Sequence, residues 1–128
     1  MSFRDSVEFF WCDTVRIVIM SSIEIDCQSV KARLDSSDSF LLLDCREQSE
    51  WDHVHIQGAI LLPMSEIQDR VDELEHHRNC DVVVHCHHGG RSLQVARWLL
   101  RQGFSSVFNM TGGIDVWAQE IDNSLPRY

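Results

Sequence analysis

Residues 81–100 read DVVVHCHHGGRSLQVARWLL and place a strand, a loop and a helix in immediate succession. The run Val82–Val84 is apolar and β-branched, which is typical of a strand buried on both faces. Beyond the loop, apolar residues recur at helical spacing from Val95 to Leu100, and Gly103 supplies a C-terminal stop. A strand, a short loop and a helix in this order predict one unit of a parallel α/β sheet.

The same alternation extends over most of the chain. Further strands are expected at 22–26, 40–47, 58–63 and 106–110. Helices are expected at 26–35, in a short turn at 47–51, after residue 65 and through 117–118. Alternating strands and helices indicate an α/β protein with a parallel sheet.

The helix after residue 65 has its own start signal. Ser65 and Gln68 have the spacing of a capping box, in which each side chain binds a free backbone amide. Ile67, Val71 and Leu74 then mark one helical face. The pattern predicts a single helix that begins near Ser65.

Length and charge exclude several classes of protein. The 128 residues suit one domain, and an apolar fraction of 44% is enough for a core. No run of 18 apolar residues occurs, so we expect no membrane span. The net charge of −9 argues against nucleic-acid binding. Residues 76–101 are nevertheless basic, with four arginines against Asp81 alone. This suits a small anion, although chance clustering on a solvated helix face would look the same.

The first nineteen residues fit nowhere in the alternation. Charged side chains interrupt them too often for a signal peptide, and Met20 would make a natural start. We expect residues 1–19 to be an N-terminal appendage or a mis-assigned start, and residues 20–128 to form the domain. The five cysteines are odd in number and form no C-x-x-C pair, which predicts a reducing, cytoplasmic location.

Cys86 lies one residue beyond the 81–85 strand, at the sheet edge where α/β proteins bind ligands. The next helix, expected to start near Ser92, offers free amides there, and Gly89 and Gly90 allow the loop to curl around an anion. Arg91 adds a fixed cation, and three histidines add further donors: His85, His87 and His88. Such surroundings lower cysteine pKa values to ~3.5–7.5. We therefore predict that Cys86 is a nucleophile, in preference to an inert buried thiol.

Four residues separate Cys86 from Arg91. This spacing resembles the active-site loop of the rhodanese family of sulfurtransferases, whereas the related tyrosine phosphatases have five residues between Cys and Arg. The shorter loop forms a tighter amide ring, which suits one sulfur better than a whole phosphate. A phosphatase or arsenate reductase is therefore the less favoured alternative.

The resemblance covers about residues 22–128. It includes three further patterns, whose matching residues are Asp44, Arg46, Glu50 and Trp51, then His55, Ile56, Gly58 and Ala59, and finally Gly103, Phe104, Gly112, Gly113 and Trp117. The chain departs at Val54 and Gln57, where the family usually has Gly and Pro, which affects a local turn. The implied fold is three-layer α/β/α, with about five parallel strands and helices on both faces.

The resemblance implies a single-domain sulfurtransferase that needs no metal or organic cofactor. Cys86 would take a sulfane sulfur from a small anionic donor such as thiosulfate and hold it as a persulfide among the amides of residues 87–92. It would then pass the sulfur to cyanide, a thiol or a protein, with no nucleic acid or membrane as partner. A carrier or sensing module that holds sulfur without turnover is the second possibility.

Several nearby residues have more than one interpretation. We expect Asp44, followed by Arg46, to support the loop by binding its amides or a neighbouring arginine, and His55 either to orient Asp44 or to fill a turn. His87 stands where many relatives have arginine, so thiosulfate turnover is expected to be weaker, or to rise as pH falls. Adjacent ligands do not readily converge on one ion, so no metal site is predicted in HCHH. Cys45 is expected to be core.

Overall fold

A computed structural model describes residues 23–128. The expectation for residues 1–19 therefore lies outside the described part of the chain. The strands are β2 (Glu24–Ile25), β3 (Leu41–Asp44), β4 (Ile60–Leu61), β5 (Asp81–His85) and β6 (Ser106–Met110). The helices are α2 (Cys27–Asp35), α3 (Gln48–His53), α4 (Ile67–Arg70), the 3₁₀ helix η2 (Val71–His77), α5 (Gly90–Arg101) and α6 (Gly113–Glu120).

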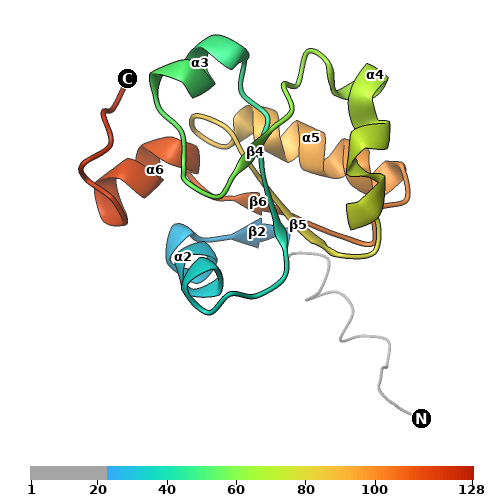
Figure 1. Cartoon of the computed structure of the whole chain (residues 1–128), viewed down its shortest axis with the longest axis horizontal. Coiled ribbons are helices and arrows are strands. Elements are labelled where there is room, and N and C mark those ends of the chain that lie inside the picture. Colours follow the sequence, from blue (N-terminus) through green and yellow to red (C-terminus); the bar gives the residue numbers. More distant parts are fainter. Residues whose placement is uncertain (1–22) are drawn as a thin grey trace.

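The five strands form one parallel sheet in the order β2-β6-β5-β3-β4 (Figure 1). β3 and β5 lie side by side inside the sheet, and Asp44 pairs with His85 at their carboxyl ends. Every residue of β3 is buried, as its unbroken apolar run predicts for a central strand. This confirms the predicted α/β fold with a parallel sheet.

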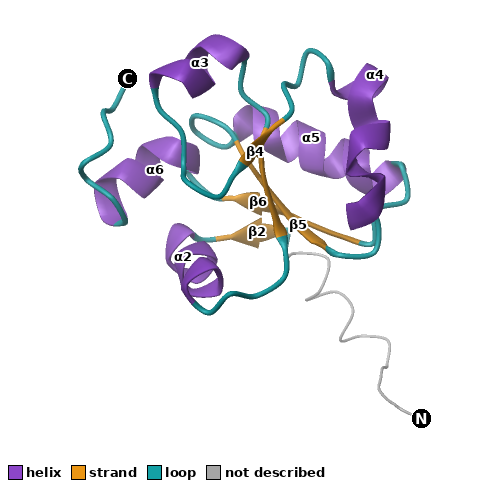
Figure 2. Cartoon of the chain, viewed as in Figure 1, coloured by secondary structure: helices purple, strands orange, loops and turns teal. Residues whose placement is uncertain are grey.

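Helices cover both faces of the sheet, which gives the molecule three layers (Figure 2). An apolar cluster fills the space on each face of the sheet. Leu41, Leu43, Val82 and Val84 face the side covered by α4, η2 and α5. Leu42 and Val83 face the side covered by α2 and α6. Alternation along each strand produces this division, because successive side chains point to opposite faces.

The prediction for residues 65–74 is wrong in two respects. α4 begins at Ile67 with Glu66 as its N-cap, and Ser65 donates its hydroxyl to Glu47 Oε1 at 2.7 Å. Ser65 therefore lies before the N-cap position, and its hydroxyl binds a carboxylate 18 residues away. The helix also tightens after Arg70 into η2, although Ile67 and Leu74 are buried as predicted.

Other boundaries differ only in extent. The strands expected at 40–47 and 58–63 are shorter in the structure, where they correspond to β3 and β4. α5 begins at Gly90 instead of Ser92, so Arg91 lies in its first turn. In the described part of the chain, no helix has both the length and the apolar character that a membrane crossing requires.

Candidate active site

Cys86 follows β5 directly and lies at the carboxyl edge of the sheet, where Asp44 ends the neighbouring β3. Its side chain is fully buried. The start of α6 holds the loop from one side: Ile114 N donates to Cys86 O at 2.9 Å, and Asp115 N donates to His87 O at 3.0 Å. α6 therefore holds the loop of Cys86 through backbone hydrogen bonds. α5 follows directly from the end of the same loop.

Glycines make this close approach possible. Gly89 adopts φ +111°, a conformation that favours glycine, as the N-cap of α5. Gly113 has φ +62°, and a Cβ there would lie 2.5 Å from the carbonyl oxygens of Cys86 and His87. Gly90 has no such role, since a Cβ there would meet nothing within 4 Å. Of the predicted glycine pair, only Gly89 therefore has the backbone geometry that requires glycine.

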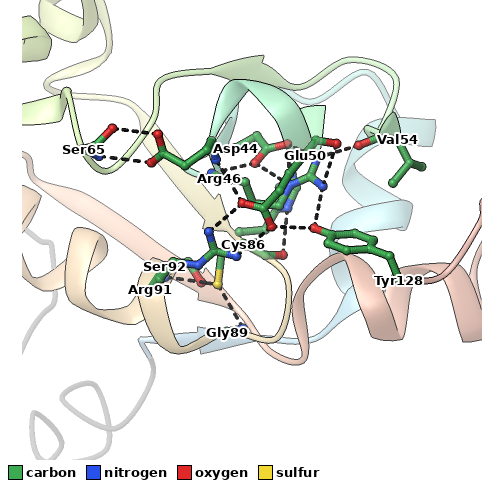
Figure 3. Close-up of polar contacts among 12 residues, drawn as sticks. Asp44, Arg46, Glu50, Val54, Ser65, Cys86, Gly89, Arg91, Ser92 and Tyr128 are labelled. Atoms are coloured by element: carbon green, nitrogen blue, oxygen red, sulfur yellow. Dashed lines mark hydrogen bonds and ion pairs between the residues drawn. The ribbon is translucent and has the colours of Figure 1, made fainter. Parts of the chain in front are cut away.

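Three donors converge on the sulfur of Cys86 (Figure 3). Gly89 N lies 3.1 Å from Sγ, and both Ser92 N and Ser92 Oγ lie at 3.3 Å. Burial opposes a charge on this sulfur, but hydrogen bonds from Ser92, Gly89 and His88 outweigh it and lower the pKa of Cys86. The surroundings thus favour the thiolate, which is the nucleophilic form of cysteine.

Asn109 connects this donor ring to β2. Its Nδ2 donates to the Glu24 carboxylate at 3.1 Å and to Gly89 O at 3.2 Å, while its Oδ1 lies 2.5 Å from Ser92 Oγ. Ser92 has one hydroxyl proton, which serves either Asn109 Oδ1 or Cys86 Sγ at a given moment. Neither Asn109 nor Glu24 was predicted as a site residue, because neither has a local sequence signal.

Arg91 pairs with Glu50 of α3 through two parallel hydrogen bonds of 2.8 and 3.0 Å. This pairing ties the start of α5 to α3 and lowers the pKa of Glu50 to about 2. The predicted cation is thus present, with its charge already partnered. Glu50 matched a family pattern in the sequence, yet its contact with Arg91 spans 41 residues and was not predicted.

Asp44 and Arg46 form a fully buried pair beside the loop. The Arg46 guanidinium donates to Asp44 at 2.6–3.1 Å and to Val54 O at 2.7 Å. Its remaining amine lies 2.8 Å from the Tyr128 hydroxyl, which in turn donates to Glu50 at 2.9 Å. Asp44 therefore binds the neighbouring arginine, which was one of its two expected partners. Tyr128, which was not predicted as a site residue, completes the network.

The predicted histidines occupy different surroundings. His85 is fully buried, and desolvation lowers its pKa although Asp44 lies 3.8 Å away. The His87 ring is stacked between Tyr128 and the exposed His88, at centroid distances of 3.9 and 3.8 Å. Burial lowers the pKa of His87 as well, so this ring is neutral at pH 7. His55 stacks on Trp51 and bonds its carbonyl oxygen at 2.9 Å, which places it against α3 just after the end of that helix.

The two adjacent histidines do come close to a third potential ligand. Ligand atoms of His87, His88 and Asp115 lie within 4.8 Å of one another. The two histidine rings, however, are stacked on each other, with 30° between their planes. Asp115 also accepts two hydrogen bonds from Arg127. These contacts explain the cluster without an ion, and the expected lack of a metal site stays a prediction.

Comparison with known proteins identifies the family. Residues 26–120 match the rhodanese-like domain. The chain is 40% identical over 96 residues to a sulfurtransferase of Allochromatium vinosum, a match that covers 75% of this chain and 88% of that protein. It is 32% identical over 77 residues to the thiosulfate sulfurtransferase GlpE of Coxiella burnetii, covering 60% of this chain and 70% of that protein.

Two further similarities differ in coverage. A Bacillus subtilis protein named as a sulfur carrier, YrkF, is 36% identical over 99 residues, or 77% of this chain, and the match spans about half (52%) of its length. The crystal structure of a rhodanese-related protein from Thermoplasma volcanium superimposes with a TM-score of 0.68 at 28% identity, covering 77% of this chain and 92% of that one. The chain that carries Cys86 and its loop is therefore a member of the rhodanese-like domain family.

Proposed function

We propose that this protein is a sulfurtransferase that carries a sulfane sulfur as a persulfide on Cys86. The convergence of Gly89 N, Ser92 N and Ser92 Oγ on the buried sulfur is the observation that carries this proposal. These donors stabilise a negative charge on a single sulfur atom, and the four residues between Cys86 and Arg91 keep the ring small. The relatives named as sulfurtransferases support the same reaction class.

The reaction has two displacements, with thiosulfate as the donor that the relative GlpE suggests. The Cys86 thiolate attacks the outer sulfur of thiosulfate, the sulfur–sulfur bond breaks, and sulfite leaves with the bonding electron pair. The terminal sulfur of the persulfide then accepts attack by cyanide or a thiolate. Thiocyanate or a new persulfide leaves, and the Cys86 thiolate returns. One difficult transfer is thereby divided into two easier ones.

Donor entry requires a movement at the loop. Cys86 has no exposed surface, and the Tyr128 ring stacks on its neighbour His87. We expect Tyr128 to move when a donor enters. Because Arg91 is paired and His87 is neutral at pH 7, the anionic donor finds mainly hydrogen-bond donors instead of a free cation. Thiosulfate should therefore bind weakly.

A steady-state assay with thiosulfate and cyanide tests this function. Wild type is expected to produce sulfite and thiocyanate in equal amounts, with the parallel double-reciprocal lines of a ping-pong reaction. Cys86→Ser should produce neither, while Cys80→Ser serves as a thiol control away from the loop. Equal activity in wild type and Cys86→Ser would contradict the proposal, as would hydrolysis of an aryl phosphate in place of sulfur transfer.

The similarity to YrkF favours a second candidate function, a sulfur carrier. A carrier would use the same Cys86 persulfide but would deliver its sulfur to a protein partner and would not turn over with small acceptors. In that case the protein becomes stoichiometrically loaded with sulfur while the steady-state rate with cyanide stays at background. The closed loop over Cys86 is compatible with such protected storage.

A further inference from the structure

A second buried thiol, Cys45, lies next to Cys86, just beyond the end of the neighbouring strand. Asp44 of β3 pairs with His85 of β5, and the ladder continues one step, since Cys45 N donates to His85 O at 3.0 Å. Cys45 and Cys86 are therefore the next facing pair, just beyond the ends of two adjacent parallel strands. Both are fully buried and both are free thiols.

The two side chains point to the same face of the sheet. Cys45 continues the alternation of Leu41 and Leu43, Cys86 continues that of Val82 and Val84, and all six residues belong to one core cluster. Facing residues on adjacent strands are separated by about 4.8 Å, within the ~4.4–6.8 Å between Cα atoms that a disulfide spans. The register thus places the two Cα atoms at a separation that a disulfide can span.

We propose that Cys45 is a resolving cysteine, which attacks the Cys86 persulfide and releases its sulfur as hydrosulfide. This inference rests on the proposed function, since the persulfide is its starting material. The sulfur of Cys45 bonds to Sγ of Cys86 as the bond from Sγ to the terminal sulfur breaks. The terminal sulfur leaves with the bonding pair, takes the proton of Cys45 and departs as HS⁻. The two cysteines are oxidised to a disulfide and the sulfane sulfur is reduced, so no external oxidant is needed.

The surroundings of Cys45 make this step slower than delivery to an acceptor. Burial, and next the charge of Cys86, raise the pKa of Cys45 above its usual range, so it is a thiol at neutral pH. A thiol attacks more slowly than a thiolate. Cys45 therefore acts on a persulfide that waits without an acceptor, and it leaves a Cys45–Cys86 disulfide. A dithiol reductant would reopen that bond and restore both thiols.

The test starts from fully reduced protein under argon. Wild type is loaded with a limiting amount of thiosulfate or inorganic polysulfide without acceptor or reductant, and intact mass is followed over time. The expected sequence is a gain of one sulfur atom, then its loss together with two hydrogens, with one equivalent of hydrosulfide released. Peptide mapping without reduction should identify the Cys45–Cys86 link, and dithiothreitol should restore the ability to load.

Two variants provide the comparison. In Cys45→Ala the persulfide should persist at least about tenfold longer, because the neighbouring thiol is gone. Cys27→Ala is the matched control, since Cys27 is also a buried thiol but lies in the core cluster on the opposite face. It should behave as wild type. Cys45→Val is a second substitution that fills the core if the alanine variant fails to fold.

The outcomes separate this inference from the proposed function. Loading that decays equally in wild type and Cys45→Ala, or a disulfide from Cys86 to another cysteine, would overturn the role of Cys45 and leave the sulfurtransferase intact. Failure of Cys45→Ala and wild type alike to gain sulfur would instead overturn the proposed function, and this inference with it.

Discussion

Ser92 is the residue whose hydroxyl affects the charge of Cys86 most directly. It lies 3.3 Å from Sγ, but it also has Asn109 Oδ1 within reach. A hydrogen bond to a charged acceptor contributes ~1.5–3 kcal/mol, or about one to two pKa units. We expect Ser92→Ala to raise the pKa of Cys86 by at least about one unit. The pH dependence of iodoacetamide alkylation measures this pKa.

Ser105→Ala is the matched control, because its hydroxyl bonds the Arg78 carbonyl away from the loop. An unchanged pKa in Ser92→Ala would mean that the hydroxyl proton belongs to Asn109 and that the backbone amides alone stabilise the thiolate.

Glu50 gives the site a dependence on pH. Its hydrogen bonds with Arg91 lower its pKa from 4.5 to about 2, so the pair stabilises the fold above pH 4.5 and this contribution is lost as pH falls toward 2. Glu50→Gln should therefore lower the free energy of unfolding by about 1 kcal/mol at pH 7, and by roughly half as much near pH 3, where the contribution is partly lost. Urea unfolding of both proteins at the two pH values measures the difference. An equal deficit at both values would show that the charge of Glu50 contributes nothing.

At the scale of elements, the start of α6 positions the loop of Cys86 through one glycine. An added Cβ at Gly113 would meet the carbonyl oxygens of Cys86 and His87 at 2.5 Å, and the positive φ adds strain. Gly113→Ala should cost ~1–3 kcal/mol of stability and slow the alkylation of Cys86, as measured by thermal unfolding and iodoacetamide. Gly90→Ala is the control: it has open space in α5 and should be neutral or stabilising by up to about 1 kcal/mol. Equal effects of the two changes would refute this role of α6.

The elements also show what local patterns can and cannot predict. The prediction of central strands was correct for the apolar runs Val82–Val84 and Leu41–Leu43, because consecutive apolar residues are typical of a strand that is buried on both faces. The capping box predicted at Ser65 is wrong because α4 has Glu66 as its N-cap, and the Ser65 hydroxyl instead binds Glu47 through a contact that no local pattern encodes. The tightening of η2 after Arg70 was missed because Ile67, Val71 and Leu74 keep a helical spacing in either helix type.

At the scale of the whole molecule, Tyr128 connects the C-terminal segment to the site. Its hydroxyl bridges Arg46 and Glu50, and its ring stacks on His87. We expect Tyr128→Ala to speed iodoacetamide alkylation of Cys86 several-fold, because the stacking partner over the loop is removed. Tyr128→Phe keeps the ring and loses only the hydroxyl, so it should stay close to wild type. If both variants match wild type, Tyr128 does not control access.

The parts of the site that could be predicted lie close together in the sequence, and the others come from distant segments. Cys86, Gly89 and Ser92 followed from their position between a strand and a helix, since that position brings free amides to the sulfur. Asn109 and Tyr128 reach the site from distant segments, and only the assembled sheet and helices show their contacts. Charge clustering located Arg91 but could not show that Glu50 neutralises it.

The central claim is that one sulfur atom is held on Cys86. The most direct measurement is the intact mass of reduced protein before and after thiosulfate, and again after cyanide, with Cys86→Ser alongside. Wild type should gain the mass of one sulfur atom, cyanide should remove it with one equivalent of thiocyanate, and the mutant should stay unchanged. Sulfur that loads equally onto Cys86→Ser, or a wild type that never gains it, would show that Cys86 does not hold the sulfur.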